Sequence, residues 1–122
     1  MSALKSKEVD GVLLVGFAHG KLLEESVIQQ VGAELVETAE NATEGQKILL
    51  TFHGVSFMSS AMLGRLVMFL KKCKQQGVEL KVCSISPEIF EVFKITKLNK
   101  MFDVQKDEEK GLASFNKKSW FS

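Results

Sequence analysis

The chain has 122 residues, of which 45% are hydrophobic, and 16 basic and 15 acidic residues give it a net charge of +1. This length fits one domain, and the apolar fraction is sufficient for a core, which excludes an intrinsically disordered chain. Basic and acidic residues are balanced, and the chain has no basic block of the kind found in nucleic-acid-binding proteins. The early apolar run over residues 12–18 is far shorter than the roughly 20 residues of a membrane-spanning helix.

The chain begins with a predicted β-hairpin. Residues 4–9 form a short candidate strand, and residues 12–17 form a stronger one that is almost continuously apolar. Asp10 and Gly11 connect the two, and both residue types tolerate the positive φ angles of a tight hairpin turn. The sequence therefore predicts two antiparallel strands at the start.

The middle of the chain then alternates helix and strand. Val27, Val31 and Leu35 recur with helical spacing, which predicts a helix over residues 24–40. Residues 47–52 form the next strand, and their apolar run is typical of a central strand that is covered on both faces.

The alternation continues to the end of the chain. A helix begins at Ser59 or Ser60 and is expected to end at Gly77, since glycine favours the conformation that terminates helices. Its predicted apolar stripe consists of Leu63, Leu66, Val67, Leu70 and Cys73. The remaining predicted elements are a strand over 79–85, a helix starting at Ser86-Pro87 with core residues Ile89, Val92 and Phe93, a strand over 102–105, and a helix over 107–115.

This order predicts the fold class. Strands that alternate with helices give an α/β domain with a mixed, mostly parallel sheet, here of four to five strands with about four helices. The domain is expected to span residues 1–115, with residues 116–122 as a C-terminal tail that contains Trp120 and Phe121. No glycine-rich phosphate loop follows the first long strand, so a nucleotide-dependent enzyme is disfavoured.

The cysteine and histidine residues do not indicate a disulfide, a metal site or a catalytic site. Cys73 and Cys83 form no CxxC pair and are expected to be buried or half-buried thiols in a reducing cytoplasm. His19 and His53 are too few and too far apart for a metal site. No acidic partner lies near His53 in the sequence, so a solvated loop histidine is favoured over a general base. We expect no cofactor, no metal and no catalytic residue.

Three segments carry a resemblance to a known family. They are Leu-Leu-Thr-Phe-His-Gly-Val-Ser-Phe-Met-Ser-Ser-Ala-Met-Leu-Gly at residues 49–64, the segment at residues 77–88 that ends in Ser-Pro-Glu, and the segment at residues 92–102. In this order the chain resembles the STAS domain (sulfate transporter and anti-sigma factor antagonist), and within it the free-standing bacterial anti-sigma factor antagonists. The resemblance covers about residues 9–115 and agrees with the α/β prediction.

The resemblance implies a phosphorylation switch. In that family a serine at the start of this helix is phosphorylated by a kinase that is also the anti-sigma factor, and a phosphatase resets it. By position that serine is Ser60. The unphosphorylated protein would bind the kinase and free the sigma factor. The family reading implies a cytoplasmic regulator that is not an enzyme, binds neither nucleic acid nor membrane, and is a monomer or weak dimer.

Three departures from the family pattern concern this site. Ser59 stands where the family has an acid, Thr51 replaces an acid at the strand end, and Met62 replaces a glycine. The expected pocket is therefore less negative and has two neighbouring hydroxyls. Spacing alone favours an ordinary helix cap at Ser59 or Ser60. Both interpretations can hold if Ser59 caps the helix while Ser60 accepts phosphate.

The surface that is expected to bind the partner lies on the segment that carries Ser59 and Ser60, and residues 86–90 are a candidate extension of it. Met62 could belong either to the core or to an adaptable apolar docking patch. An alternative function keeps the fold without the phosphoswitch, as a scaffold or accessory subunit in a stress-signalling assembly or a lipid transporter. The predicted partner-binding residues are Gly54, Val55, Ser56, Met58, Ser59, Ser60, Met62 and Arg65.

Overall fold

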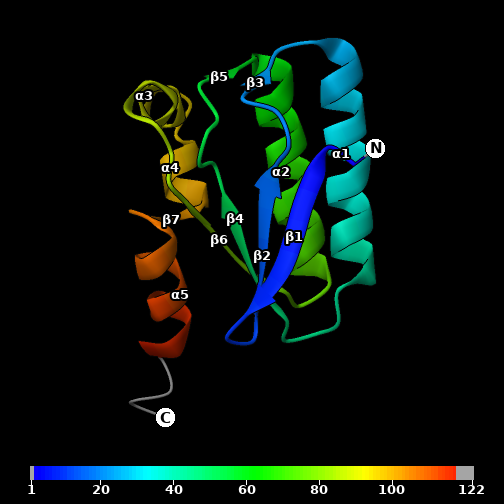
Figure 1. Cartoon of the computed structure of the whole chain (residues 1–122), viewed down its shortest axis with the longest axis vertical. Coiled ribbons are helices and arrows are strands. Elements are labelled where there is room, and N and C mark those ends of the chain that lie inside the picture. Colours follow the sequence, from blue (N-terminus) through cyan, green and yellow to red (C-terminus); the bar gives the residue numbers. More distant parts are fainter. Residues whose placement is uncertain (1, 118–122) are drawn as a thin grey trace.

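The computed structural model describes residues 2–117 and has an α/β architecture built on a five-stranded sheet (Figure 1). The sheet order is β1-β2-β4-β6-β7, with β1 antiparallel to β2 and the other neighbours parallel. The strands are β1 (Leu4–Val9), β2 (Val12–Phe17), β3 (Lys21–Leu22), β4 (Lys47–Thr51), β5 (Phe57–Met58), β6 (Glu79–Cys83) and β7 (Asp103–Gln105). The helices are α1 (Glu25–Asn41), α2 (Ser60–Gln75), α3 (Pro87–Ile95), α4 (Leu98–Met101) and α5 (Glu108–Lys117). The predicted fold class is confirmed.

The predicted hairpin is present with the expected strand boundaries. Asp10 and Gly11 have φ angles of 52° and 80°, so both adopt the left-handed conformation of a tight turn that matches the twist of the strands. This turn fixes the register of β1 on β2, in which Val9 lies opposite Val12.

The sheet separates two hydrophobic cores. Ile48 and Leu50 of β4 belong to the larger core, which α1 and α2 cover as a pair. Leu49 points to the opposite face and belongs to a smaller core under α5. Because successive strand residues alternate between faces, the apolar run of β4 reflects a strand buried on both sides, as predicted.

Three short elements escaped the sequence analysis. β3 and β5 contain two residues each and pair in parallel, with Lys21 opposite Phe57, so no local periodicity marks them. α4 has four residues and follows Lys97, whose φ is 63°. Strand β6 ends at Cys83, two residues earlier than expected, because Ser84 has a φ of 60° that breaks the extended backbone.

The buried face of α2 is wider than the predicted stripe. Met62 and Phe69 are fully buried beside Leu66 and Leu70. The expectation that Val92 belongs to the core is wrong, since its side chain is 38% exposed on α3.

Both cysteines are buried free thiols, and burial raises the pKa of Cys73 to about 12. Trp120 and Phe121 lie outside the described residues. Among residues 2–117, no helix combines the length and apolar character needed to cross a membrane.

Candidate functional site

The candidate site lies where β4 gives way to α2, and long-range backbone bonds fix its position. Gly54 adopts a φ of 84° in the connecting loop, which turns the chain after the strand. The N–H of Ser56 donates to the carbonyl of Gly20 at 2.8 Å, and the N–H of Ser59 donates to the carbonyl of Leu22 at 3.0 Å. The segment around β3 therefore holds the start of α2 in place.

The two neighbouring serines have different roles. Ser59 is half-buried and is the N-cap of α2, and its Oγ accepts a hydrogen bond from the N–H of Met62 at 3.3 Å. Ser60 is the first residue of the helix and is exposed to solvent. Within residues 2–117, the Ser60 hydroxyl has no hydrogen-bond partner. One hydroxyl is thus occupied by capping, and its neighbour is accessible.

A cavity of about 330 Å³ lies beside these serines, between the start of α2 and the start of α1. Glu25 and Arg65 contribute opposite charges to its lining. Arg65 lies against Gly32 of α1, because a Cβ at that glycine would meet the Arg65 Cδ at 2.8 Å. The missing side chain at position 32 therefore makes room for the arginine.

Exposed apolar side chains flank the same site. Leu23 is 49% exposed and Phe57 is 53% exposed. Lys21 places its Nζ 5.6 Å from the centre of the Phe57 ring. The sequence analysis missed Lys21 and Leu23 because they belong to the segment around β3, whose pairing with β5 is long-range.

The predicted surface residues divide into three groups. Gly54, Ser56 and Ser60 are exposed, whereas Met58, Ser59 and Arg65 are half-buried. Val55 is 3% exposed and Met62 is 0% exposed, so neither can contact a partner in this conformation. Placing Met62 on an exposed docking patch is therefore corrected: it faces the larger core because it lies one turn from Leu66.

The start of α3, which the sequence analysis offered as an extension of the partner surface, lies beside the loop. A cavity of about 290 Å³ is lined by Val55, Ser56 and Phe57 from the loop and by Ser86 and Glu88 from α3. Ser86 caps α3 by accepting a hydrogen bond from the N–H of Ile89 at 3.3 Å. Two helix starts therefore border the loop.

Acidic residues at the start of α5 also approach the loop. Thr51 donates its hydroxyl hydrogen bond to Glu108 at 3.0 Å and accepts one from the N–H of His53 at 3.2 Å. His53 lines a cavity of about 460 Å³ with Asp107, Glu108 and Glu109. The sequence could not show this proximity, because more than fifty residues separate the segments. A carboxylate thus reaches the strand end although position 51 itself carries none.

The described residues contain no group of three or more histidine, cysteine or acidic side chains positioned to hold a metal ion. The arrangement offers an exposed hydroxyl at a helix start, surrounded by apolar and charged side chains. Such a surface suits protein recognition and covalent modification.

Residues 17–111 match a protein-family model that is described as "STAS domain". A Bordetella bronchiseptica protein, BtrV, provisionally named an anti-sigma factor antagonist, is 26% identical over 115 residues, which cover 92% of this chain and 93% of that protein. An anti-sigma factor antagonist (STAS) domain protein from Planctomyces limnophilus has a similar structure, with a TM-score of 0.81, 20% identity, and coverage of 93% of this chain and 98% of that chain. The Bacillus cell fate determinant SpoIIAA in its phosphorylated form has a TM-score of 0.63, 19% identity, and coverage of 88% of this chain and 95% of that chain.

Proposed function

This chain belongs to the STAS domain family, and we propose that it acts as an anti-sigma factor antagonist switched by phosphate on Ser60. The observation that carries the proposal is the accessible Ser60 hydroxyl at the start of α2, beside a serine whose own hydroxyl is used as a cap. The provisional name of the Bordetella relative supports the same role. The protein acts by binding and not by catalysis.

The helix start tolerates a phosphate. The first N–H groups of a helix lack intrahelical partners, and the helix dipole places positive charge at this end. A phosphate adds about −1.5 to −2 charges, which these groups stabilise locally. Phosphorylation of Ser60 therefore leaves α2 folded and changes the surface instead.

The surface explains how that charge would end an association. Leu23 and Phe57 supply apolar contact area on either side of the serines. A partner that covers these side chains would also desolvate Ser60. A phosphate at this position then has to lose its hydration or lie beside negative charges of the partner, and both effects oppose binding.

The proposed partner is an anti-sigma factor that is also a serine kinase, and a phosphatase returns the protein to its binding form. The test incubates the purified protein with each candidate anti-sigma kinase of its own genome and ATP, followed by peptide mapping. We expect phosphate on Ser60, and we expect Ser60→Ala to abolish it. Ser59→Ala is the matched control, because it removes the neighbouring hydroxyl and leaves the acceptor in place.

Binding provides the second readout. We expect Ser60→Ala to retain kinase binding and Ser60→Glu to weaken it by roughly tenfold or more. Phosphate on Ser59 with Ser60 unmodified would contradict the assignment of the acceptor. If neither serine is modified and the protein copurifies with a transporter or a large stress-signalling assembly, the scaffold or accessory-subunit function replaces the switch.

A further inference from the structure

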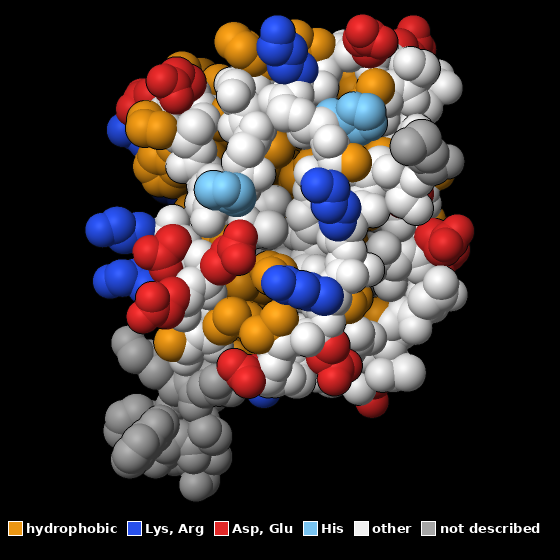
Figure 2. Space-filling view, viewed as in Figure 1, with side chains coloured by type: hydrophobic (Ala, Val, Ile, Leu, Met, Phe, Trp, Pro, Cys, Tyr) orange, Lys and Arg blue, Asp and Glu red, His pale blue; other side chains and the backbone are white. Residues whose placement is uncertain are grey.

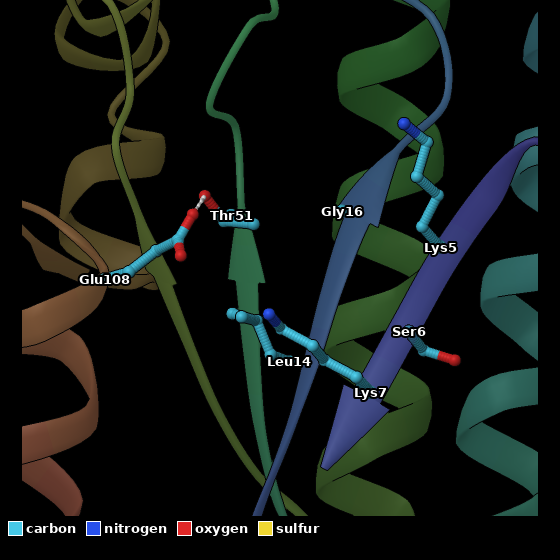
Figure 3. Close-up of a pocket in the computed structure, with 7 residues that line it drawn as sticks. All are labelled: Lys5, Ser6, Lys7, Leu14, Gly16, Thr51 and Glu108. Atoms are coloured by element: carbon cyan, nitrogen blue, oxygen red, sulfur yellow. Dashed lines mark hydrogen bonds between the residues drawn. The ribbon is translucent and has the colours of Figure 1, made fainter. Parts of the chain in front are cut away.

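One face of the sheet holds a cavity beside α5, and a strand with two lysines borders this cavity. Helix α5 packs against β4, β6 and β7, whereas a cavity of about 310 Å³ lies over β1 and β2, next to α5 (Figure 3). Leu14 and Gly16 line it from β2, and Lys5 and Lys7 line it from β1. Figure 2 shows this side of the molecule, with basic side chains over the middle of the face and a hydrophobic patch next to them.

Strand β1 is an edge strand whose outer backbone groups can be assigned from its pairing. The N–H of Ala18 donates to the carbonyl of Ala3 at 2.8 Å, so the Ala3 carbonyl and the backbone groups of Lys5 and Lys7 face β2. Leu4, Ser6 and Glu8 consequently direct theirs outward. The N–H of Leu4 is already bonded to Glu34 at 3.0 Å, which leaves the outer edge open at Ser6 and Glu8.

The side chains of β1 alternate in the same way. Lys5 and Lys7 lie opposite Gly16 and Leu14, on the face that carries the cavity. In Figure 3 the Lys7 side chain extends across β2 toward Leu14. The middle of the strand is fully exposed. The edge therefore presents two positive charges on one face.

This pattern disfavours pairing of β1 with a second copy of itself. Two antiparallel copies of β1 can form hydrogen bonds only if their outward-directed residues lie opposite each other. In the registers of greatest overlap, a lysine of one copy (Lys5 or Lys7) then lies opposite Lys5 or Lys7 of the other copy. Like charges placed directly opposite on neighbouring strands are destabilising. Lysine on an edge strand is a recognised protection against such self-association.

We propose that the outer edge of β1 binds an extended segment of another protein that carries acidic residues at every second position. Such a segment adds a sixth strand to the sheet. Its backbone bonds to the outward groups of Ser6 and Glu8, and its alternate carboxylates lie beside Lys5 and Lys7. The charge pattern that disfavours a second copy favours this partner. The proposal is independent of the phosphorylation of Ser60.

The test uses a synthetic eight-residue peptide in which glutamate alternates with threonine and valine, added to the full-length protein and followed by amide hydrogen exchange. We expect exchange to slow at Ser6 and Glu8, whose N–H groups point outward. Exchange at Lys5 and Lys7 should change little, because their N–H groups already bond to β2. Raising the salt concentration should weaken the effect.

A second experiment reverses the charges of Lys5 and Lys7. Lys5→Glu combined with Lys7→Glu should weaken binding of the glutamate peptide by roughly tenfold and create binding to the corresponding lysine peptide. Lys71→Glu combined with Lys74→Glu on exposed positions of α2 makes the same change of net charge elsewhere and should do neither. Equal binding of a peptide with its glutamates grouped together would overturn the proposal. So would protection of Ser6 and Glu8 that appears without peptide as the protein concentration rises, since that would indicate self-pairing.

Discussion

At the scale of single residues, Ser59 and Ser60 illustrate what sequence and structure each contribute. The sequence places two hydroxyls at the start of a helix and, through its resemblance to a family, favours Ser60 as the acceptor. The hydrogen bond from the Met62 N–H to the Ser59 Oγ separates their roles physically. Spacing alone could not do so, because either serine can serve as an N-cap.

This separation predicts different effects on stability. Ser59→Ala removes the cap and should lower the free energy of unfolding by about 1 kcal/mol, whereas Ser60→Ala should change it by less than about 0.5 kcal/mol. Urea denaturation of both variants is the measurement. Ser86→Ala provides a matched loss of a capping serine on α3 and should resemble Ser59→Ala. A larger loss for Ser60→Ala than for Ser59→Ala would contradict the assignment.

Met62 is the residue for which the sequence left two interpretations open, and its burial decides between them. The side chain is 0% exposed, so Met62→Ala should cost about 2–5 kcal/mol of unfolding free energy through the cavity it leaves. Met68→Ala on the same helix is the control, because Met68 is 52% exposed and its truncation should cost less than about 0.5 kcal/mol. Thermal melting of the two variants distinguishes them, and equal melting temperatures would argue against a core position for Met62.

At the scale of elements, the sequence predicted the long helices and strands well and missed the short pairings. The run of apolar residues in β4 and the capped start of α3 are local signals, and both elements lie where expected. The pairing of β3 with β5 joins segments that lie more than thirty residues apart and leaves no periodic pattern. Leu23 and Lys21 could therefore be assigned to the site only from the structure.

The contact between α1 and α2 predicts an effect on Arg65. Gly32→Ala places a methyl group against the Arg65 side chain, which should move away while both backbones stay in place. Helix propensity alone favours alanine by about 1 kcal/mol, so the protein should remain folded while binding of the proposed kinase partner changes. Gly64→Ala is the control, since a Cβ there meets nothing within 4 Å. Chemical shifts of the Arg65 Nε report the displacement, and unchanged shifts in Gly32→Ala would refute it.

Glu34 of α1 ties the first strand to the helix and predicts a dependence on pH. Desolvation would raise the pKa of Glu34, but hydrogen bonds from the N–H groups of Ala3 and Leu4 outweigh it and hold the pKa below its ordinary value of 4.5. The stabilisation is therefore complete above that value and is lost as the pH falls through the lower pKa of the folded state. Glu34→Gln should be less stable at neutral pH and lose less stability on acidification.

Urea midpoints measured between neutral pH and the acidic limit of folding test this expectation. Glu37→Gln, at an exposed position of the same helix, is the control and should follow the original protein. Identical pH profiles for Glu34→Gln and the original protein would show that the carboxylate does not hold β1.

At the scale of the whole molecule, α5 is the helix that a sequence-based account places least well. The sequence predicts a helix over residues 107–115, but not which strands it covers. Lys81 of β6 fixes that arrangement: its Nζ lies 3.0 Å from the Ser114 Oγ and 4.8 Å from the centre of the Phe115 ring. A buried lysine in a strand gives no hint in the sequence of the helix it contacts.

Truncating this lysine should loosen one layer of the molecule. Lys81→Ala removes the contacts to Ser114 and Phe115 and the ion pair with Asp103 at 3.5 Å, so amide exchange should accelerate in α5 and β7 and stay unchanged in α1 and α2. Lys94→Ala is the control: Lys94 lies 6.0 Å from the Phe90 ring centre, and its side chain is 50% exposed on α3. Uniform acceleration across all helices would indicate a general loss of stability and not a local release.

The hydroxyl of Thr51 has a consequence for the way distant parts of the chain can influence one another. It donates to Glu108 of α5 and accepts from the backbone of His53, so one oxygen atom joins the C-terminal helix to the loop that leads to Ser60. Valine has nearly the same shape but could satisfy neither group. Loss of this one oxygen would therefore weaken the anchoring of the C-terminal helix and of the loop together, although neither segment would itself have changed.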